Sequence, residues 1–112
     1  MTGIPEGIIS IALDAMGGDH GPVVMVPAAL KAIGNGGVAV ALVGDAEAIQ
    51  AELDKYDTPA KQLVQVVPAE GVVEEGESPA RAFRSKPNAS IFVSAGVVKM
   101  GKAAGFVSMG ST

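Results

Sequence analysis

Short aliphatic runs alternate along this chain with stretches in which apolar residues recur at helical spacing. This order predicts an α/β fold. The runs contain few polar residues, which is typical of strands covered on both faces of a parallel sheet. Strands are expected at residues 8–13, 38–43, 63–67 and 106–109. Helices are expected at residues 22–33, 46–56, 80–85 and 90–102. Strands and helices that alternate with short links form βαβ units, which join parallel strands through right-handed crossovers.

Capping residues predict where the helices begin. Pro22 suits the first position of the first helix, and Asp45 is expected to cap the second. Ser78 and Ser90 are the expected caps of the third and fourth helices. Pro27 conflicts with the first helix, because an interior proline costs about 3 kcal/mol. That helix is therefore expected to start only near this proline or to be kinked there.

Composition indicates a compact domain. The 112 residues are 48% hydrophobic and 18% charged, which suffices for one core and excludes a disordered tail. The absence of cysteine excludes disulfides and cysteine-held metals. Eight basic and twelve acidic residues give a net charge of −4, which argues against general binding to nucleic acid or anionic lipid. The chain contains neither an apolar stretch of membrane-spanning length nor a signal-peptide pattern, so a soluble cytoplasmic protein is expected.

The turn after the first aliphatic run carries the candidate chemistry. From Asp14 to Pro22 the chain reads DAMGGDHGP, a glycine-rich turn between an expected strand and an expected helix. Free amides and a helix dipole in that arrangement receive an anion, commonly phosphate. The glycine spacing is neither the G-x-G-x-x-G of a dinucleotide site nor the terminal G-K-[ST] of a P-loop. The spacing therefore does not identify the ligand.

The amino-acid sequence of this turn resembles that of a known family. Residues 11–22, IALDAMGGDHGP, closely resemble the N-terminal signature of the PlsX-type phosphate acyltransferases, bacterial enzymes of fatty acid and phospholipid synthesis. Residues 101–112, GKAAGFVSMGST, resemble the family's GKADAFVSAGNTGA. Met109 replaces the usual alanine and Ser111 the usual asparagine.

The likeness covers nearly the whole chain. Residues 42–45, LVGD, and the acidic-to-basic segment from Glu77 to Lys86 also resemble the family. Family members are far longer, which implies that residues 1–112 are the N-terminal α/β portion of a longer phosphate acyltransferase domain. The resemblance further implies an incomplete part of the three-layer fold of isocitrate and isopropylmalate dehydrogenases.

The resemblance also implies a reaction. Inorganic phosphate attacks the thioester of an acylated acyl carrier protein, which yields acyl phosphate and free carrier without a cofactor or a metal. A homodimer and peripheral association with the inner face of the membrane are implied in the same way.

Candidate site residues cluster where strands are expected to end. The candidate catalytic residues are His20, Asp14 and Asp19, with His20 donating a hydrogen bond or accepting a proton and an aspartate orienting it. The candidate phosphate-binding residues are Gly17, Gly18, Gly21, Ser108, Gly110, Ser111 and Thr112. The alternative is structural: the aspartates cap the turn and the next helix, and the glycines only allow a tight turn.

Basic residues follow the acidic stretch of the chain. Arg81 and Arg84 are three apart and share a helical face, from which they could reach an anionic ligand or an acidic partner. With Lys86 they are the candidate contacts for the acyl carrier protein. The alternative is a solvated surface, where each exposed pair contributes at most about 1 kcal/mol.

Two other function classes stay open. GGDHGP also resembles the G-D-x-x-G-P turn of metal-dependent decarboxylating dehydrogenases, although no acidic residue is evidently placed for a ribose. The chain could instead be a non-catalytic fragment or an interaction module. In the parallel-sheet fold, residues 14–21, 44–45 and 108–112 are expected to face one crevice, with uncovered apolar surface at the C-terminal edge.

Overall fold

The computed structural model describes residues 7–16, 21–71 and 78–108, and it confirms the expected α/β class. Within these residues, four parallel strands form one sheet in the order β3-β2-β1-β4. The strands are β1 (Ile9–Asp14), β2 (Val38–Gly44), β3 (Val64–Pro68) and β4 (Gly105–Ser108). The helices are α1 (Pro22–Gly34), α2 (Ala46–Leu53), α3 (Pro79–Ser85) and α4 (Ser90–Lys99), and a short 3-10 helix, η1 (Pro59–Leu63), precedes β3.

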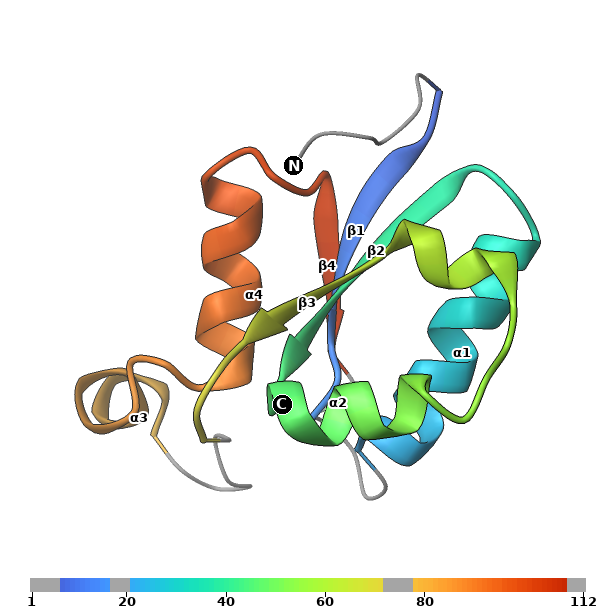
Figure 1. Ribbon diagram of the computed structural model, residues 1–112. Helices are drawn as coiled ribbons and strands as arrows, with labels where there is room; N and C mark the ends of the chain where they lie inside the picture. Colours follow the sequence, from blue (N-terminus) through green and yellow to red (C-terminus); the bar gives the residue numbers. More distant parts are fainter. Residues whose placement is uncertain (1–6, 17–20, 72–77, 109–112) are drawn as a thin grey trace.

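Side chains of different size cover the two faces of the sheet. On one face, β2 presents Val40 and Leu42 to a core of large apolar residues from α1 and α2. On the other face, alternation places Ala39, Ala41 and Val43, and α4 packs there. Figure 1 shows the sheet between α4 on one side and α1 and α2 on the other. The chain therefore forms helical layers on both faces of a central sheet.

The direction of travel through the sheet reverses at β1. The chain first moves from β1 through α1 to β2 and through α2 to β3, with both helices on one face. It then returns through α3 and α4 to β4, on the other side of β1, and α4 lies on the opposite face (Figure 1). Right-handed crossovers require this change of face. In open α/β sheets the ligand crevice lies beyond the carboxyl ends of the strands at such a reversal, here between β1 and β4.

The expected apolar surface at the C-terminal edge is present. β4 ends the sheet on one side, and its Phe106 and Val107 are 41% and 48% exposed. Among the described residues, no helix is both long and apolar enough to cross a membrane.

α1 begins at Pro22, which confirms the prediction for its first position. The helix continues through Pro27, so the expectation that it starts only near this proline was wrong. The proline removes the N–H that would pair with the carbonyl of Val23, four residues earlier. Val23 is 61% exposed, so this turn of α1 lies at the surface.

Two helices also end earlier than predicted. α2 ends at Leu53 because the amides that follow bond to carbonyls three residues back and not four. An example is the Tyr56 N–H, which donates to the Leu53 carbonyl at 3.0 Å. α4 ends at Lys99 because Gly101, with φ 78°, forms a Schellman motif in which its N–H bonds to the Val98 carbonyl at 2.9 Å.

Ser90 was also predicted wrongly as a cap. The cap of α4 is Ala89, and Ser90 is the first helical residue, with its N–H bonded to the Gly71 carbonyl at 3.1 Å. Its side chain is buried and does not cap the helix.

Candidate functional site

The connections that follow β1, β2 and β4 leave the sheet at the same edge. Asp14, the last residue of β1, is the register partner of Val43 on one side and of Ser108 on the other. Because parallel strands end together, the residues just after β1, the start of α2 and the end of β4 are neighbours. This edge includes the reversal of strand order between β1 and β4.

Asp14 is a buried carboxylate at this edge, with 2% of its surface exposed. Its Oδ1 accepts the Met16 N–H at 2.9 Å, and its Oδ2 accepts the Ser108 hydroxyl at 3.0 Å. Register partners point to the same face of a sheet, so the Asp14 and Ser108 side chains both lie on the face that α4 covers. This Asp14–Ser108 bridge ties the turn after β1 directly to the end of β4.

Met16 makes a second link, from β1 to β2. Its sulfur accepts the Asp45 N–H at 3.4 Å, and its side chain covers Gly44. Asp45 caps α2 as predicted, because its Oδ1 accepts the N–H groups of Glu47 and Ala48 at 3.1 and 3.2 Å. The ends of three neighbouring strands are thus joined through Asp14 and Met16.

Gly21 closes the glycine-rich segment and starts α1. Its backbone has φ 54° and ψ −136°, a conformation that residues with side chains rarely adopt. Its carbonyl accepts the N–H groups of Val24 and Met25 at 3.1 and 3.0 Å. A Cβ built on Gly21 would lie 3.6 Å from the Ala15 carbonyl oxygen, so both ends of the segment lie close together.

Several predicted site residues lie outside the described parts of the chain. They are Gly17, Gly18, Asp19, His20, Gly110, Ser111 and Thr112. Their roles stay predictions. Of the candidates for catalysis and phosphate binding, the structure places Asp14, Gly21 and Ser108, and it brings Asp14 and Ser108 into contact.

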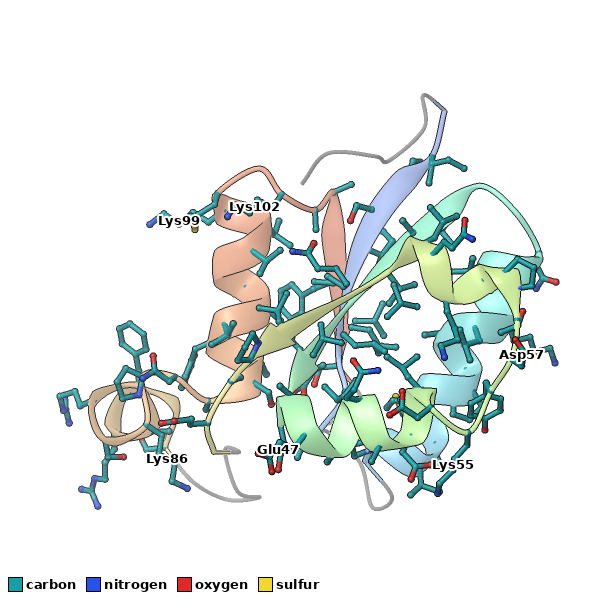
Figure 2. All side chains as sticks on the ribbon, viewed as in Figure 1. Glu47, Lys55, Asp57, Lys86, Lys99 and Lys102 are labelled. Atoms are coloured by element: carbon teal, nitrogen blue, oxygen red, sulfur yellow. The ribbon has the colours of Figure 1, made fainter. Side chains whose placement is uncertain are left out.

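The predicted basic residues belong to α3 and its C-terminal end. Arg81 and Arg84 are exposed and Lys86 is half-buried. Lys86 lies toward the same edge of the molecule as Glu47, in the first turn of α2, whereas the labelled lysines near the end of α4 lie at the opposite edge (Figure 2). Lys86, at the C-terminal end of α3, therefore lies toward the side where the strands end.

α3 is attached through few contacts. Phe83 packs edge-on against Phe92 of α4, with ring centroids 5.1 Å apart and an angle of 70° between the rings, and Phe83 remains 57% exposed. A hydrogen bond also joins the segments on either side of α3: the N–H of Glu70, which precedes the helix, donates to the carbonyl of Asn88, which follows it, at 2.7 Å. This bond holds the connection against the end of β3.

Sequence reasoning missed the contacts that Met16 and Gly44 make. The sequence placed Gly44 at the end of a strand, in the LVGD motif and in the expected crevice, and Met16 in the turn, but it did not predict that the two are in contact. The available signal was positional: a glycine that ends one parallel strand can admit a side chain from the end of its neighbour.

The fold and this edge define a doubly wound α/β protein, a class in which ligands bind where the strand order reverses. A family model described as "Fatty acid synthesis protein" matches residues 9–112, and the chain belongs to this family.

The chain is also similar to proteins named phosphate acyltransferase. The relative from Picosynechococcus sp. is 48% identical over 100 residues, which cover 89% of this chain and 27% of the relative. The relative from Desulforamulus reducens is 48% identical over 105 residues, which cover 94% of this chain and 31% of the relative. The relative from Alkalilimnicola ehrlichii is 42% identical over 105 residues, which cover 93% of this chain and 31% of the relative. The resemblance to PlsX-type phosphate acyltransferases is thereby confirmed, and the chain spans less than a third of the length of these relatives.

Proposed function

We propose that this chain forms the phosphate-binding part of a phosphate acyltransferase, which transfers an acyl group from acyl carrier protein to inorganic phosphate. The observation that carries the proposal is the Asp14–Ser108 bridge across the reversal of strand order. It holds the start of the glycine-rich turn, at Asp14, beside the end of β4, at the place where α/β sheets bind anionic ligands. The similarity to proteins named phosphate acyltransferase supports the same reaction.

The reaction needs positioning more than a protein nucleophile. A phosphate oxygen attacks the thioester carbonyl carbon, and the carbonyl oxygen gains negative charge. The tetrahedral intermediate then collapses, the carbon–sulfur bond breaks, and the carrier leaves as a thiolate that takes up a proton. The site must therefore hold phosphate, align it with the carbonyl carbon and stabilise the oxyanion.

The proposed roles follow from this chemistry. The amides of Gly17, Gly18 and Gly21 and the polar groups after β4 hold phosphate oxygens. The latter come from Gly110, Ser111 and Thr112, while Ser108, the last residue of β4, donates its hydroxyl to Asp14 and supports this segment. His20 donates a hydrogen bond to phosphate or to the thioester oxygen, and Asp19 orients it.

Asp14 has a different role in this proposal. Its Oδ1 accepts the Met16 N–H, and its Oδ2 accepts the Ser108 hydroxyl. It therefore acts through these partners as a positioning residue, by keeping the two phosphate-binding segments together.

The acyl donor approaches from the side of α3. Arg81 and Arg84 are exposed there, and Lys86 lies at the same edge as the site. Acyl carrier protein is acidic, so this positive surface would attract it and raise the rate of encounter. A homodimer, a cytoplasmic location and peripheral association with the membrane belong to the same proposal and rest on the resemblance.

A dehydrogenase function has less support. Asp45 follows β2, where dinucleotide-binding folds often carry the acidic residue that binds the ribose. Its Oδ1 instead caps α2.

The test is an assay of the protein expressed from the complete reading frame. With acylated carrier and phosphate it should release free carrier and form an acyl phosphate, which hydroxylamine traps as a hydroxamate. Sulfate in place of phosphate should give no product. Gly18→Val should raise the KM for phosphate, while Gly34→Val, at the exposed end of α1, should leave it unchanged. Thioester consumption that does not depend on phosphate would refute the proposal, and tight binding of NAD would favour the dehydrogenase.

A further inference from the structure

Met16 lies where the glycine-rich segment begins, and hydrogen bonds hold both its main chain and its side chain. Its N–H donates to Asp14 Oδ1 at 2.9 Å, and its sulfur accepts the Asp45 N–H at 3.4 Å. We propose that Met16 is a positioning residue for phosphate, a role that rests on the proposed function. It would fix the point from which the phosphate-binding amides start.

Gly44 provides the space that Met16 fills. A Cβ at Gly44 would lie 2.5 Å from Met16 Cγ and 2.7 Å from Met16 Sδ, closer than such atoms can approach. It would also lie 3.4 Å from Cδ1 of Ile49, a fully buried core residue of α2. The Met16 side chain therefore rests in a notch, here called the Gly44 notch, that exists because Gly44 has no side chain.

The notch joins the glycine-rich segment to a rigid part of the molecule. β2 is the most buried strand, and the buried Ile49 follows in α2. At the other end of the segment, Gly21 is held by the first turn of α1. Both ends are thus anchored to elements whose positions the core determines.

Anchoring matters because main-chain amides bind an anion well only when they are already in position. A displacement of about 1 Å can cost up to about 100-fold in a site that depends on orientation. Met16 does not need to touch phosphate to have this effect. Its loss should weaken phosphate binding while leaving the acyl carrier surface on α3 intact.

The experiment uses the protein expressed from the complete reading frame, with inorganic phosphate as the probe. The variants are Met16→Ala, which empties the notch, Gly44→Ala, which expels an intact Met16, and the double variant. Gly34→Ala is the matched control, because a Cβ at Gly34 meets nothing within 4 Å. Calorimetry gives the Kd for phosphate, and steady-state kinetics give kcat and the KM for each substrate.

Both single variants should raise the Kd and KM for phosphate about tenfold, while the KM for the acylated carrier stays constant. The double variant should lose no more than the worse single variant, because both changes break the same contact. Gly34→Ala should behave as the wild type. Should Gly44→Ala not fold, Met16→Leu, which removes the sulfur and keeps an apolar side chain, should show a smaller rise in the Kd for phosphate.

Two results separate this inference from the proposed function. A wild-type protein that binds no phosphate would overturn both. A wild-type protein that binds phosphate, with variants that bind it within twofold of the wild type, would overturn the role of Met16 alone. Losses in phosphate affinity that add in the double variant, or that disappear once the folded fraction is corrected by circular dichroism, would also overturn it.

Discussion

Removing the Asp14 carboxylate tests the bridge that holds the site together. Asp14→Ala takes away the acceptor of the Met16 N–H and of the Ser108 hydroxyl. Each hydrogen bond to a charged acceptor contributes about 1.5–3 kcal/mol, and a buried donor left without a partner costs about 1–3 kcal/mol. Part of this loss is offset because a carboxylate with 2% exposure no longer has to be desolvated. The net expectation is a local destabilisation of about 2–4 kcal/mol.

Asp14→Asn separates geometry from charge. The asparagine oxygen can accept the Met16 N–H, and its NH₂ group can donate to the Ser108 oxygen, so both contacts survive with one direction reversed. This variant should therefore cost less than about 1 kcal/mol. Asp57→Ala is a suitable control, because Asp57 is exposed on the connection between α2 and η1.

Amide hydrogen exchange provides the assay. The Ala15 N–H donates to the Val43 carbonyl at 2.8 Å and does not contact the Asp14 side chain, so its exchange reports the opening of this edge. A loss of 2–4 kcal/mol should speed that exchange about 30-fold to 1,000-fold in Asp14→Ala. The asparagine and control variants should change little. Equal acceleration in the alanine and asparagine variants would refute the reasoning, because the charge and not the hydrogen bonds would then hold the edge.

Three further predictions concern the other candidates. His20→Ala should lower kcat about 100-fold, and an unchanged rate and pH profile would give His20 a structural role. Arg84→Glu should raise the KM for acylated carrier about tenfold at low salt, with less effect at high salt, and a KM that responds to neither would leave α3 as ordinary surface. Asp45→Ala should destabilise α2 by about 1 kcal/mol through loss of its cap, measured by thermal unfolding, and an unchanged midpoint would show that the cap contributes little.

The sequence predicted the strands and their parallel βαβ arrangement because local patterns decide where strands and helices form. Aliphatic runs identified β1 and β2 within a residue or two, and Asp45 was recognised as a cap. These features depend on residues that are close together along the chain. The 3-10 helix η1 was missed, since its polar residues carry no clear periodicity.

The contacts of the site could not be predicted in the same way. The Asp14–Ser108 bridge joins residues 94 apart, and it depends on β4 lying next to β1 in a particular register. A shift of one residue in β4 would turn Ser108 to the opposite face. The Met16 contact likewise depends on the parallel register of β1 and β2.

In α1, a local preference and tertiary packing favour different structures. Pro27 should end or kink a helix by itself, but the buried face formed by Met25, Val26, Ala29 and Leu30 keeps α1 continuous. Tertiary packing therefore outweighed the intrinsic preference of one residue.

The two sides of the sheet should also differ in how freely their sequences can change during evolution. Beneath α4 the sheet presents the alanines at positions 12, 39 and 41, which are almost fully buried. Any larger residue there would push α4 outward, whereas Val40 and Leu42 on the other face can exchange with aliphatic residues of similar volume. Related sequences should thus vary more freely beneath α1 and α2 than beneath α4.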